Sequence, residues 1–546
     1  MTIDAVRVPP YDGDPVVIVG NGPVGQTLAL LLARWGIGSV LLDRRAERDM
    51  VGSKAICQQR DVLDIWDSVG VGATIADEGV TWERARTFYR EHELFCLEFA
   101  DRGKSVFPPF VNISQCRTEE LLDAEIAATE PVDVRWSHTV TDVRDTADGV
   151  EVRVTGPQGE EVLHAPYAVV CAGAHSDGIR QGLGVDFEGR SFDDHFLICD
   201  IRARLPGWEQ ERRFYFDPEW NPGRQVLIHP CPDSTYRIDW QVPEDFDLEA
   251  EERSGALDER IRRIIGDADY EIMWKSVYRF HSRCVNRMRV GHVLLAGDCA
   301  HLMAPFGARG LNSGIADAEN AAWKLAFALH DWAGEELVES YHAERLAAAR
   351  ENLAVTTATM DFLVPQSRAA WQRRRATLER ALADPQARSA VDSGRLYEPF
   401  WYVDSPLTTL DPTREPASRP PRGQLPAPGV GVALPDIGIV DPATGDATRL
   451  RRFCRHGLTV LFADDGRPAV ATGDLARLAA PVRLHAMADL SPDGSLAEAL
   501  GARRGEVWVV RPDAVTAAVL ADGDPAGLRD ALERVVGHPS PGAPGR

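Results

Sequence analysis

One short segment near the N-terminus constrains the fold most. Residues 20–25 read Gly-Asn-Gly-Pro-Val-Gly; they follow a run of four apolar residues, 16–19, and precede a helical run, 27–35. Glycines at this spacing permit a tight turn, close approach of a pyrophosphate and close packing of helix on strand. The helix N-terminus offers unpaired N–H groups to the phosphates. The segment predicts a β–α–β unit that binds a dinucleotide, the alternative being a glycine turn with a structural role only.

The next predicted strand supports the nucleotide interpretation. Residues 39–42 read Ser-Val-Leu-Leu and are followed by Asp43, where a carboxylate can hold the hydroxyls of an adenosine ribose. This unit alone does not distinguish NAD from FAD.

Composition excludes several classes of protein. The chain has 546 residues, 44% hydrophobic and 26% charged, which is typical of a globular protein with several domains. The net charge of −23 disfavours a nucleic-acid partner. The nine cysteines are scattered, without a CxxC pair, so we expect no metal site and reduced thiols in a cytoplasmic protein. No segment predicts a signal peptide or a membrane span.

A second motif is more specific. Residues 297–320 read GDCAHLMAPFGARGLNSGIADAEN and follow another apolar run, 293–296. This stretch resembles the second flavin motif of the single-component (class A) FAD-dependent aromatic hydroxylases. That family includes phenol hydroxylase, 3-(3-hydroxyphenyl)propionate hydroxylase and p-hydroxybenzoate hydroxylase. The resemblance predicts FAD as the cofactor.

The resemblance also implies roles for individual residues. Asp298 would bind the ribityl chain, Pro305 would lie beside the reactive edge of the flavin, and Leu311 and Asn312 would offer backbone N–H groups to the pyrimidine carbonyl. A helix N-terminus there would stabilise the negative charge of reduced flavin. Arg44 would lie near the phosphates, Gln115 near the ribityl or phosphate region, and Val140 against the adenine. The predicted FAD-binding residues are thus Gly20, Gly22, Pro23, Val24, Gly25, Asp43, Arg44, Gln115, Val140, Asp298, Pro305, Gly310, Leu311 and Asn312.

The reaction implied by the resemblance is hydroxylation of a phenolic aromatic substrate. NADPH or NADH would reduce the FAD, and O2 would then add to give a flavin C4a-hydroperoxide that transfers one oxygen atom. One departure concerns the nicotinamide: in the run Cys-Ala-Gly-Ala-His-Ser-Asp-Gly, Ala172 stands where the family carries Asp, and Asp177 with Gly178 is a candidate substitute. The alternatives are a reductase or oxidase of the same fold, or a non-catalytic flavin-binding protein. A flavin halogenase is disfavoured because the WxWxIP motif is absent.

Candidate substrate residues come from an alternating segment. In residues 236–242, Tyr236, Ile238 and Trp240 share one face of a predicted strand, and Arg237 and Asp239 share the other. A phenol is activated by a base or a cation that favours its phenolate. We therefore predict Arg237 and Asp239 as catalytic residues, with His229 as a base or anchor. The alternatives are a solvated sheet face and a hydrogen-bonded turn histidine. We expect His301 to order the flavin loop.

The predicted architecture is α/β with three domains. A discontinuous Rossmann-like FAD-binding domain would comprise residues 1–185 and 283–402, with an antiparallel-sheet substrate domain, 186–282, inserted in it. Residues 403–424 would form a Pro-rich linker, since eight prolines lie between positions 406 and 435. We expect this stiff tether to separate two folding units. In residues 425–546 we predict strands at 458–462 and 506–510 and helices near 473–480 and 525–535. Through the run Val-Val-Arg-Pro-Asp at 509–513, this part resembles the thioredoxin-like appendage of phenol hydroxylase. We expect this C-terminal domain to serve stability and assembly of a homo-oligomer rather than chemistry.

Overall fold

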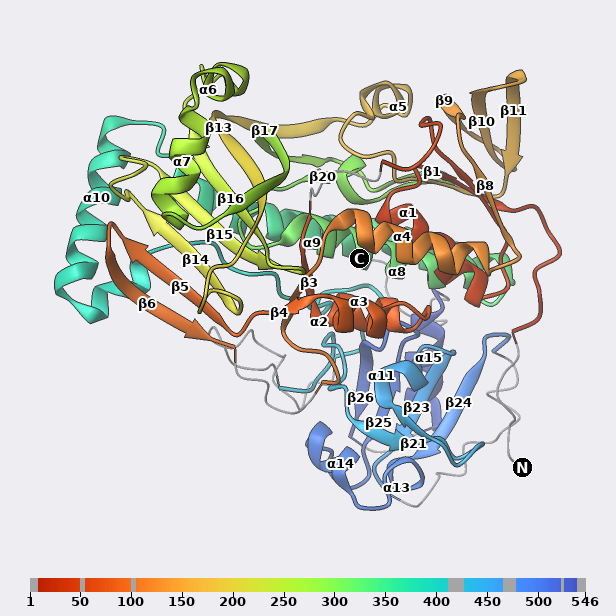
Figure 1. Ribbon diagram of the computed structural model, residues 1–546. Helices are drawn as coiled ribbons and strands as arrows, with labels where there is room; N and C mark the ends of the chain where they lie inside the picture. Colours follow the sequence, from red (N-terminus) through yellow and green to blue (C-terminus); the bar gives the residue numbers. More distant parts are fainter. Residues whose placement is uncertain are drawn as a thin grey trace.

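The computed structural model describes residues 8–49, 55–99, 105–410, 427–464, 478–521 and 525–537. It contains a parallel-sheet domain, an eight-stranded sheet beside it and a smaller C-terminal domain below (Figure 1). The predicted fold class is confirmed. Parts of the Pro-rich segment and of a helix predicted near 473–480 lie outside the described residues.

The parallel-sheet domain is built on the predicted β–α–β unit. Strand β1 (Val16–Val19) is buried throughout and pairs in parallel with β2 (Ser39–Leu42) and β12 (Ala168–Val170). Continuous apolar strands of this kind suit a sheet covered on both faces. The strand order is β18-β19-β12-β1-β2-β8, and only β18 is antiparallel to its neighbour. The other strands of this sheet are β8 (Val132–Arg135), β18 (Arg289–Val290) and β19 (Val293–Leu295).

Glycines bring the two sequence motifs together. Helix α1 (Pro23–Arg34) packs on α8 (Arg309–Leu329), and the methyl groups of Val24 lie against Gly297 and Gly314. A Cβ on Gly314 would come within 2.7 Å of Val24 Cγ2. The absence of side chains at these positions therefore allows the close approach of α1 to α8.

The eight-stranded sheet has two distinct faces. Its strand order is β20-β17-β13-β16-β15-β14-β5-β6. The outer face packs against Leu257 and Ile261 of α7 (Ala256–Ile265). The inner face, which includes Phe214 and Leu227, packs against Phe306 of the second motif. The sheet consists of β5 (Arg84–Tyr89), β6 (His92–Glu98), β13 (Phe187–Ala203), β14 (Glu211–Phe216), β15 (Gln225–Cys231), β16 (Thr235–Val242), β17 (Tyr270–Val285) and β20 (His301–Leu302).

Strands β5 and β6 extend this sheet beyond the predicted substrate domain. They come from the segment assigned to the FAD-binding domain, and β5 pairs with β14 in parallel. The other described elements connect and cover the two domains. They are β3 (Cys57–Gln59), α2 (Arg60–Asp67), α3 (Gly72–Glu78), β4 (Val80–Thr81), β7 (Phe110–Asn112), α4 (Gln115–Ala127), β9 (Thr139–Thr146), β10 (Gly149–Gly156), β11 (Gly159–Ala165), α5 (Asp177–Gly182), α6 (Leu248–Ser254), η1 (Gly297–Cys299), α9 (Glu335–Leu363), α10 (Arg368–Ala383) and η2 (Pro385–Ala390).

The C-terminal domain has the mixed sheet expected of a thioredoxin-like domain. Its strand order is β24-β23-β25-β26; β23 and β24 are parallel, and the other pairs are antiparallel. Its single cysteine, Cys454, is buried. The described elements are β21 (Gly438–Val440), β22 (Ala447–Arg449), α11 (Leu450–Cys454), β23 (Leu458–Phe462), β24 (Val482–Ala486), α13 (Met487–Leu490), α14 (Ser495–Leu500), β25 (Val507–Val510), β26 (Thr516–Leu520) and α15 (Pro525–Val535).

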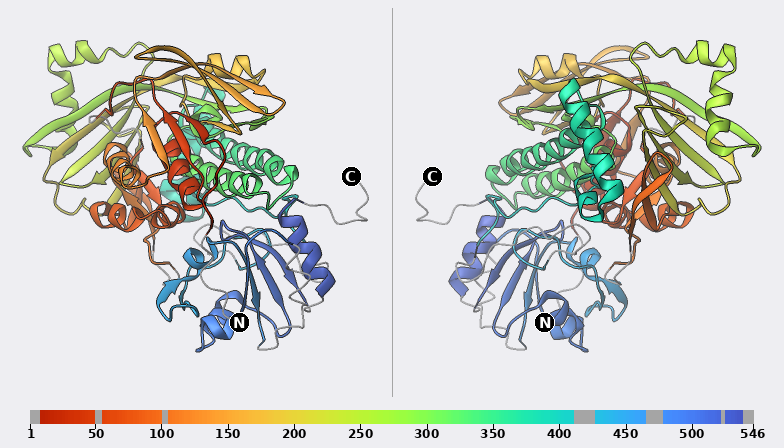
Figure 2. Two further views of the ribbon diagram at one scale, coloured as in Figure 1. Left: turned by 90° about the vertical axis from the view of Figure 1, so that its right-hand side faces the viewer. Right: turned by 90° about the vertical axis from the view of Figure 1, so that its left-hand side faces the viewer.

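This domain docks closely on the rest of the chain, beneath α2 and α8 (Figure 2). Arg455, with 4% of its side chain exposed, bonds to Asp64 of α2 and to Glu319 of α8, both at 2.8 Å. Burial raises the pKa of the Glu319 carboxyl to about 7, although the Arg455 charge opposes the rise. The Pro-rich linker predicted two separable units, whereas the structure joins them by buried ion pairs.

We predict that Arg455→Ala destabilises the protein by about 3–5 kcal/mol, because removing one partner leaves buried carboxylates without their counter-charge. The neighbouring Arg452 pairs with Asp67 at 3.8 Å and is 59% exposed, so Arg452→Ala should cost only about 0–1 kcal/mol. Chemical denaturation followed by tryptophan fluorescence measures both. Equal losses in the two variants would contradict the interpretation.

Candidate active site

The first glycine turn has the geometry that a dinucleotide requires. Gly20 has φ +111°, and a Cβ there would come within 2.5 Å of the Cys171 carbonyl oxygen. A Cβ on Gly25 would lie 2.0 Å from the Gly20 carbonyl oxygen. A Cβ on Gly22, in contrast, would meet no heavy atom within 4 Å. Gly22 is the N-cap residue of α1, and Pro23 and Val24 follow it in the first turn. The chain's own packing thus needs Gly20 and Gly25, whereas Gly22 faces open space that suits a pyrophosphate.

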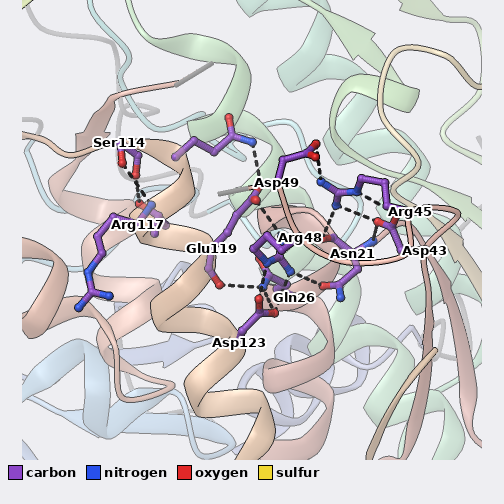
Figure 3. Close-up of polar contacts among 12 residues, drawn as sticks. Asn21, Gln26, Asp43, Arg45, Arg48, Asp49, Ser114, Arg117, Glu119 and Asp123 are labelled. Atoms are coloured by element: carbon purple, nitrogen blue, oxygen red, sulfur yellow. Dashed lines mark hydrogen bonds and ion pairs between the residues drawn. The ribbon is translucent and has the colours of Figure 1, made fainter. Parts of the chain in front are cut away.

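Arg48 is the principal cation behind this turn (Figure 3). It is buried, and its guanidinium donates to the Asn21 carbonyl at 3.1 Å and to Glu119 at 2.7 Å, and also pairs with Asp123. Gln26 donates to Asp123 at 2.6 Å and so ties α1 into the same cluster. Sequence reasoning missed Arg48, because its partners on α4 lie about 70 positions away along the chain.

Asp43 lies at the predicted place but is fully engaged. Its Oδ2 accepts from the Asn21 N–H at 3.0 Å, and the Arg45 guanidinium spans both carboxylate oxygens at 3.0 and 2.9 Å. Burial raises the pKa of the Asp43 carboxyl, but these hydrogen bonds outweigh it and lower the pKa below its usual value. Ribose hydroxyls therefore reach Asp43 only where Arg45 moves aside. Arg44 is exposed and has no ion pair with the described residues, so its phosphate role stays a prediction.

Gln115 and Val140 lie near the same turn. Gln115 begins α4; it accepts from the Ala55 N–H at 3.1 Å and donates to Glu119 at 2.8 Å, next to the Arg48 cluster. Val140 lies near the start of β9, two residues after His138, whose N–H donates to the Asp43 carbonyl. The structure thus places both residues near the nucleotide side of the turn.

A buried carboxylate of α8 accepts hydrogen bonds from the second motif. Asp317 of α8 accepts from the Gly297 N–H at 3.0 Å, from the His301 ring at 2.7 Å and from Arg345 at 2.6 Å. Burial raises the pKa of Asp317, but Arg345 and His301 bring it below its usual value. Asp298, in the turn above, remains exposed. This geometry agrees with a loop-ordering role for His301 and leaves Asp298 accessible to a ribityl chain.

The N-terminus of α8 is open where a flavin ring would lie. Ala308 has φ +57° and gives α8 no side-chain cap, and a Cβ on Gly310 would meet no heavy atom within 4 Å. Leu311 is half-buried and Pro305 is exposed. The Asn312 side chain is used internally, since it donates to the Cys57 carbonyl and accepts from the Gln59 N–H, both at 3.0 Å. The unpaired helix end and the uncovered glycine fit the pyrimidine end of a flavin.

Three predicted catalytic residues meet on the inner face of the eight-stranded sheet. His229 is directly opposite Arg237 in the β15–β16 register, and Asp239 is opposite Leu227, which packs with Phe306. This face is largely enclosed: Arg237 is 3% exposed and bonds to Asp200 at 2.9 Å, whereas His229 and Asp239 are half-buried.

Burial and neighbouring charges shift the pKa values of several side chains in this cluster. Burial raises the pKa of Asp239 to about 7, although Arg237 opposes the rise, and its Oδ1 has no hydrogen-bond partner among the described residues. Burial, with the nearby cations, lowers the pKa of His229 well below its usual value. Arg212 of β14, which sequence reasoning missed, is also buried, and burial lowers its pKa to about 10. Perturbed titratable groups of this kind favour a functional site.

A hydrogen-bonded chain joins this cluster to α8. Asn312 donates to the carbonyl of Cys57, which is opposite Asn112 in the β3–β7 pair. Asn112 donates in turn to the Pro230 carbonyl at 2.8 Å, next to His229. These contacts connect the polar sheet face to the start of α8.

In the predicted nicotinamide segment, the Asp177 side chain is 74% exposed and Arg180 is buried, so the role of Asp177 stays a prediction. Asp177 pairs with Arg180 at 2.6 Å, and Arg180 donates to the Cys299 carbonyl of the second motif at 3.0 Å. Among the described residues, no cluster of His, Cys, Asp or Glu could hold a metal ion. No described helix is long and apolar enough to span a membrane.

Comparison with known families decides which cofactor this site fits. The family described as "FAD binding domain" matches residues 14–356, which include both motifs and the inserted sheet. The chain belongs to this FAD-binding family.

Similar proteins support the predicted resemblance to class A hydroxylases. The chain is 30% identical over 362 residues to 3-(3-hydroxy-phenyl)propionate/3-hydroxycinnamic acid hydroxylase of Mycolicibacterium smegmatis; the match covers 65% of this chain and 62% of that protein. It is 29% identical over 539 residues to 12-dehydrotetracycline 5-monooxygenase/anhydrotetracycline 6-monooxygenase of Streptomyces rimosus, covering 96% and 99%. It is 33% identical to Dialkyldecalin synthase of Streptomyces rugosporus, covering 63% and 72%.

Solved structures agree in fold. The flavin-dependent monooxygenase PieE, in complex with FAD and substrate, superposes with a TM-score of 0.83 at 22% identity and covers 97% of this chain and all of that one. The OxyS anhydrotetracycline hydroxylase of Streptomyces rimosus gives a TM-score of 0.69 at 26% identity and covers 96% and 99%.

We predict that Asp298→Ala lowers the affinity for FAD by about 10- to 100-fold, because a charge-assisted hydrogen bond of about 1.5–3 kcal/mol is lost. Asp298→Asn keeps an acceptor and should lose less. Fluorescence titration of the apoprotein with FAD measures both. Wild-type affinity in the Ala variant would show that Asp298 does not contact the cofactor.

We predict that Asp239 makes apoprotein stability depend on pH. Its pKa of about 7 in the folded state lies above the unfolded value of about 3.9. The folded state therefore holds the extra proton between these values, so stability falls as pH rises from about 4 to 7, by up to about 1.4 kcal/mol per pH unit, and levels off above. Asp239→Asn should lack this slope in urea denaturation measured across the range. Parallel pH profiles for wild type and variant would contradict the assignment.

Proposed function

We propose that the chain is a monooxygenase that uses FAD, O2 and a nicotinamide reductant to hydroxylate a phenolic aromatic substrate. The observation that carries the proposal is the connection between the open α8 N-terminus and the buried polar face of the sheet, through Asn312, Cys57, Asn112 and Pro230. The FAD-binding family supplies the cofactor, and the hydroxylase relatives supply the reaction class.

The candidate residues would fall into two groups, one that binds the cofactor and one that contacts the substrate. On the cofactor side, Gly22 and the first turn of α1 would bind the pyrophosphate, Asp298 the ribityl chain, and the N–H groups of Leu311 and Asn312 the pyrimidine. When bound, FAD supplies the electron transfer and oxygen activation that side chains cannot supply.

On the sheet side, Asp239 is the candidate base for the phenol proton. A carboxylate with a pKa near 7 can accept that proton at neutral pH, whereas an ordinary carboxylate is a weaker base. The cations Arg237 and Arg212 would favour the phenolate that results. His229, whose low pKa keeps it neutral, would serve as a hydrogen-bonding anchor.

The relatives that match the full length favour a fused-ring substrate. The protein from Streptomyces rimosus, whose name refers to tetracycline intermediates, aligns over 96% of this chain. The hydroxyphenylpropionate hydroxylase aligns over 65%. We therefore propose a polycyclic phenol rather than a small single-ring one. A homo-oligomer, a cytoplasmic location and the choice between NADPH and NADH stay predictions.

One relative makes the reaction type worth testing directly. Dialkyldecalin synthase, despite 33% identity, does not carry a hydroxylase name. A hydroxylase consumes NAD(P)H in response to substrate and yields a product heavier by one oxygen atom. A reductase or oxidase yields no oxygenated product, and a binding protein consumes no nicotinamide.

We predict that Asp239→Ala lowers coupled hydroxylation by about 10²- to 10⁴-fold while FAD content stays at the wild-type level, because a general base is lost and the flavin motifs are untouched. Asp200→Asn is the comparison variant: Asp200 lies on the same face and bonds to Arg237, but it is not the candidate base. Product mass and oxygen uptake per bound flavin are the readouts. Unchanged product formation in Asp239→Ala would leave His229 as the candidate base.

A further inference from the structure

The C-terminal domain reaches the flavin motif through buried polar contacts. Arg511 follows β25, and its guanidinium donates two hydrogen bonds to the Glu344 carboxylate of α9, at 2.5 and 3.0 Å. Both side chains are about 1% exposed. The Arg511 guanidinium also lies 5.0 Å from the centre of the Tyr402 ring. A charged group from this domain is thus buried within the parallel-sheet domain.

The contacts continue from Tyr402 to the second motif. The Tyr402 hydroxyl accepts from Arg345 at 2.7 Å, and Arg345 donates to Asp317 at 2.6 Å and to the Ser313 carbonyl of α8 at 3.2 Å. Asp317 holds the Gly297 N–H. Tyr402 itself is fixed by the C-terminal domain, since its N–H donates to the Gly431 carbonyl.

A second route ends at the other side of the same motif. Arg451 of α11 pairs with Asp61, which exchanges two hydrogen bonds with Gln59, at 2.6 and 2.7 Å. The Gln59 N–H then donates to Asn312 in the first turn of α8. The two routes share no residue. One ends at the turn that would hold the ribityl chain, and the other at the helix end that would face the flavin pyrimidine.

We propose that the C-terminal domain positions the flavin: Arg511 and Tyr402, acting through Arg345 and Asp317, fix the turn at Gly297 and the start of α8 in the geometry that binds FAD. These are positioning residues, because they act through others. The proposal rests on FAD binding at these motifs. It goes beyond a role in stability or assembly, since a domain that only stabilises the fold has no specific effect on the cofactor.

The alternative is that this buried network only holds the domains together. Lys324 also donates to Glu344 at 2.7 Å, so the network has a structural component. The two possibilities differ in what happens at the flavin motif when one contact is removed and the fold survives. Tyr402→Phe is suited to this purpose, because it deletes one hydroxyl and leaves the Arg511–Glu344 pair intact.

The experiment compares Tyr402→Phe and Arg511→Met with the control Arg452→Met in the full chain. Arg452 lies at the same domain interface, and its ion pair within the described part of the chain is with Asp67 of α2. Three quantities are measured: hydrogen exchange of residues 297–301 in the apoprotein, the dissociation constant for FAD, and the midpoint potential of bound FAD.

We expect both test variants to bind FAD about 3- to 30-fold more weakly and to exchange faster at residues 297–301. The midpoint potential should become more negative, because a displaced α8 N-terminus stabilises the reduced anionic flavin less. The control should match wild type in all three.

The proposal would be overturned if Tyr402→Phe kept its FAD dissociation constant and its exchange rates at residues 297–301 within twofold of wild type and left the midpoint potential unchanged. This holds even if Arg511→Met were less stable overall. If Arg511→Met fails to fold, Tyr402→Phe alone decides. Wild-type protein that binds FAD but hydroxylates no phenol would contradict the proposed function and leave this inference intact.

Discussion

The close approach of α1 to α8 is the constraint on which the molecule depends. Both helices begin at a cofactor motif, and they meet where Val24 lies against Gly297 and Gly314. Any side chain at Gly314 would separate the helices and, with them, the pyrophosphate turn and the flavin turn. The dinucleotide must bridge these two turns, so their separation is a requirement of binding as well as of packing.

Helix α8 also connects the three domains. Its start bonds through Asn312 to Cys57 of β3, and β7, which pairs with β3, bonds through Asn112 to Pro230 of the eight-stranded sheet. Its middle contains the buried Asp317, and Glu319 and Trp323 further along bond to Arg455 and Asp513 of the C-terminal domain. Charged residues in such positions carry a desolvation penalty, which is offset only by good ion-pair geometry. The chain meets this condition with arginines that span two partners, as Arg455 does between Asp64 and Glu319.

The sequence was sufficient to predict features that depend on neighbours along the chain. The two glycine motifs, the apolar strands and the alternation in residues 236–242 are local patterns, and their strands appear as expected. The alternation separated the two sheet faces correctly, but only the structure shows that the Arg237 face packs toward the flavin motif. Arg48, Arg212 and Arg511 were missed, because each functions through partners on distant elements and no local spacing marks them.

The Pro-rich segment shows how a local pattern can mislead. Eight prolines predicted a stiff tether between separable units, and stiffness of a connection says nothing about the surfaces on either side of it. Here those surfaces bury opposite charges: arginines of the C-terminal domain meet carboxylates of α2, α8 and α9. A module detached from these surfaces would remove the arginine partners of those carboxylates and expose the carboxylates to water. The C-terminal domain therefore completes the ion pairs of the FAD-binding part of this chain.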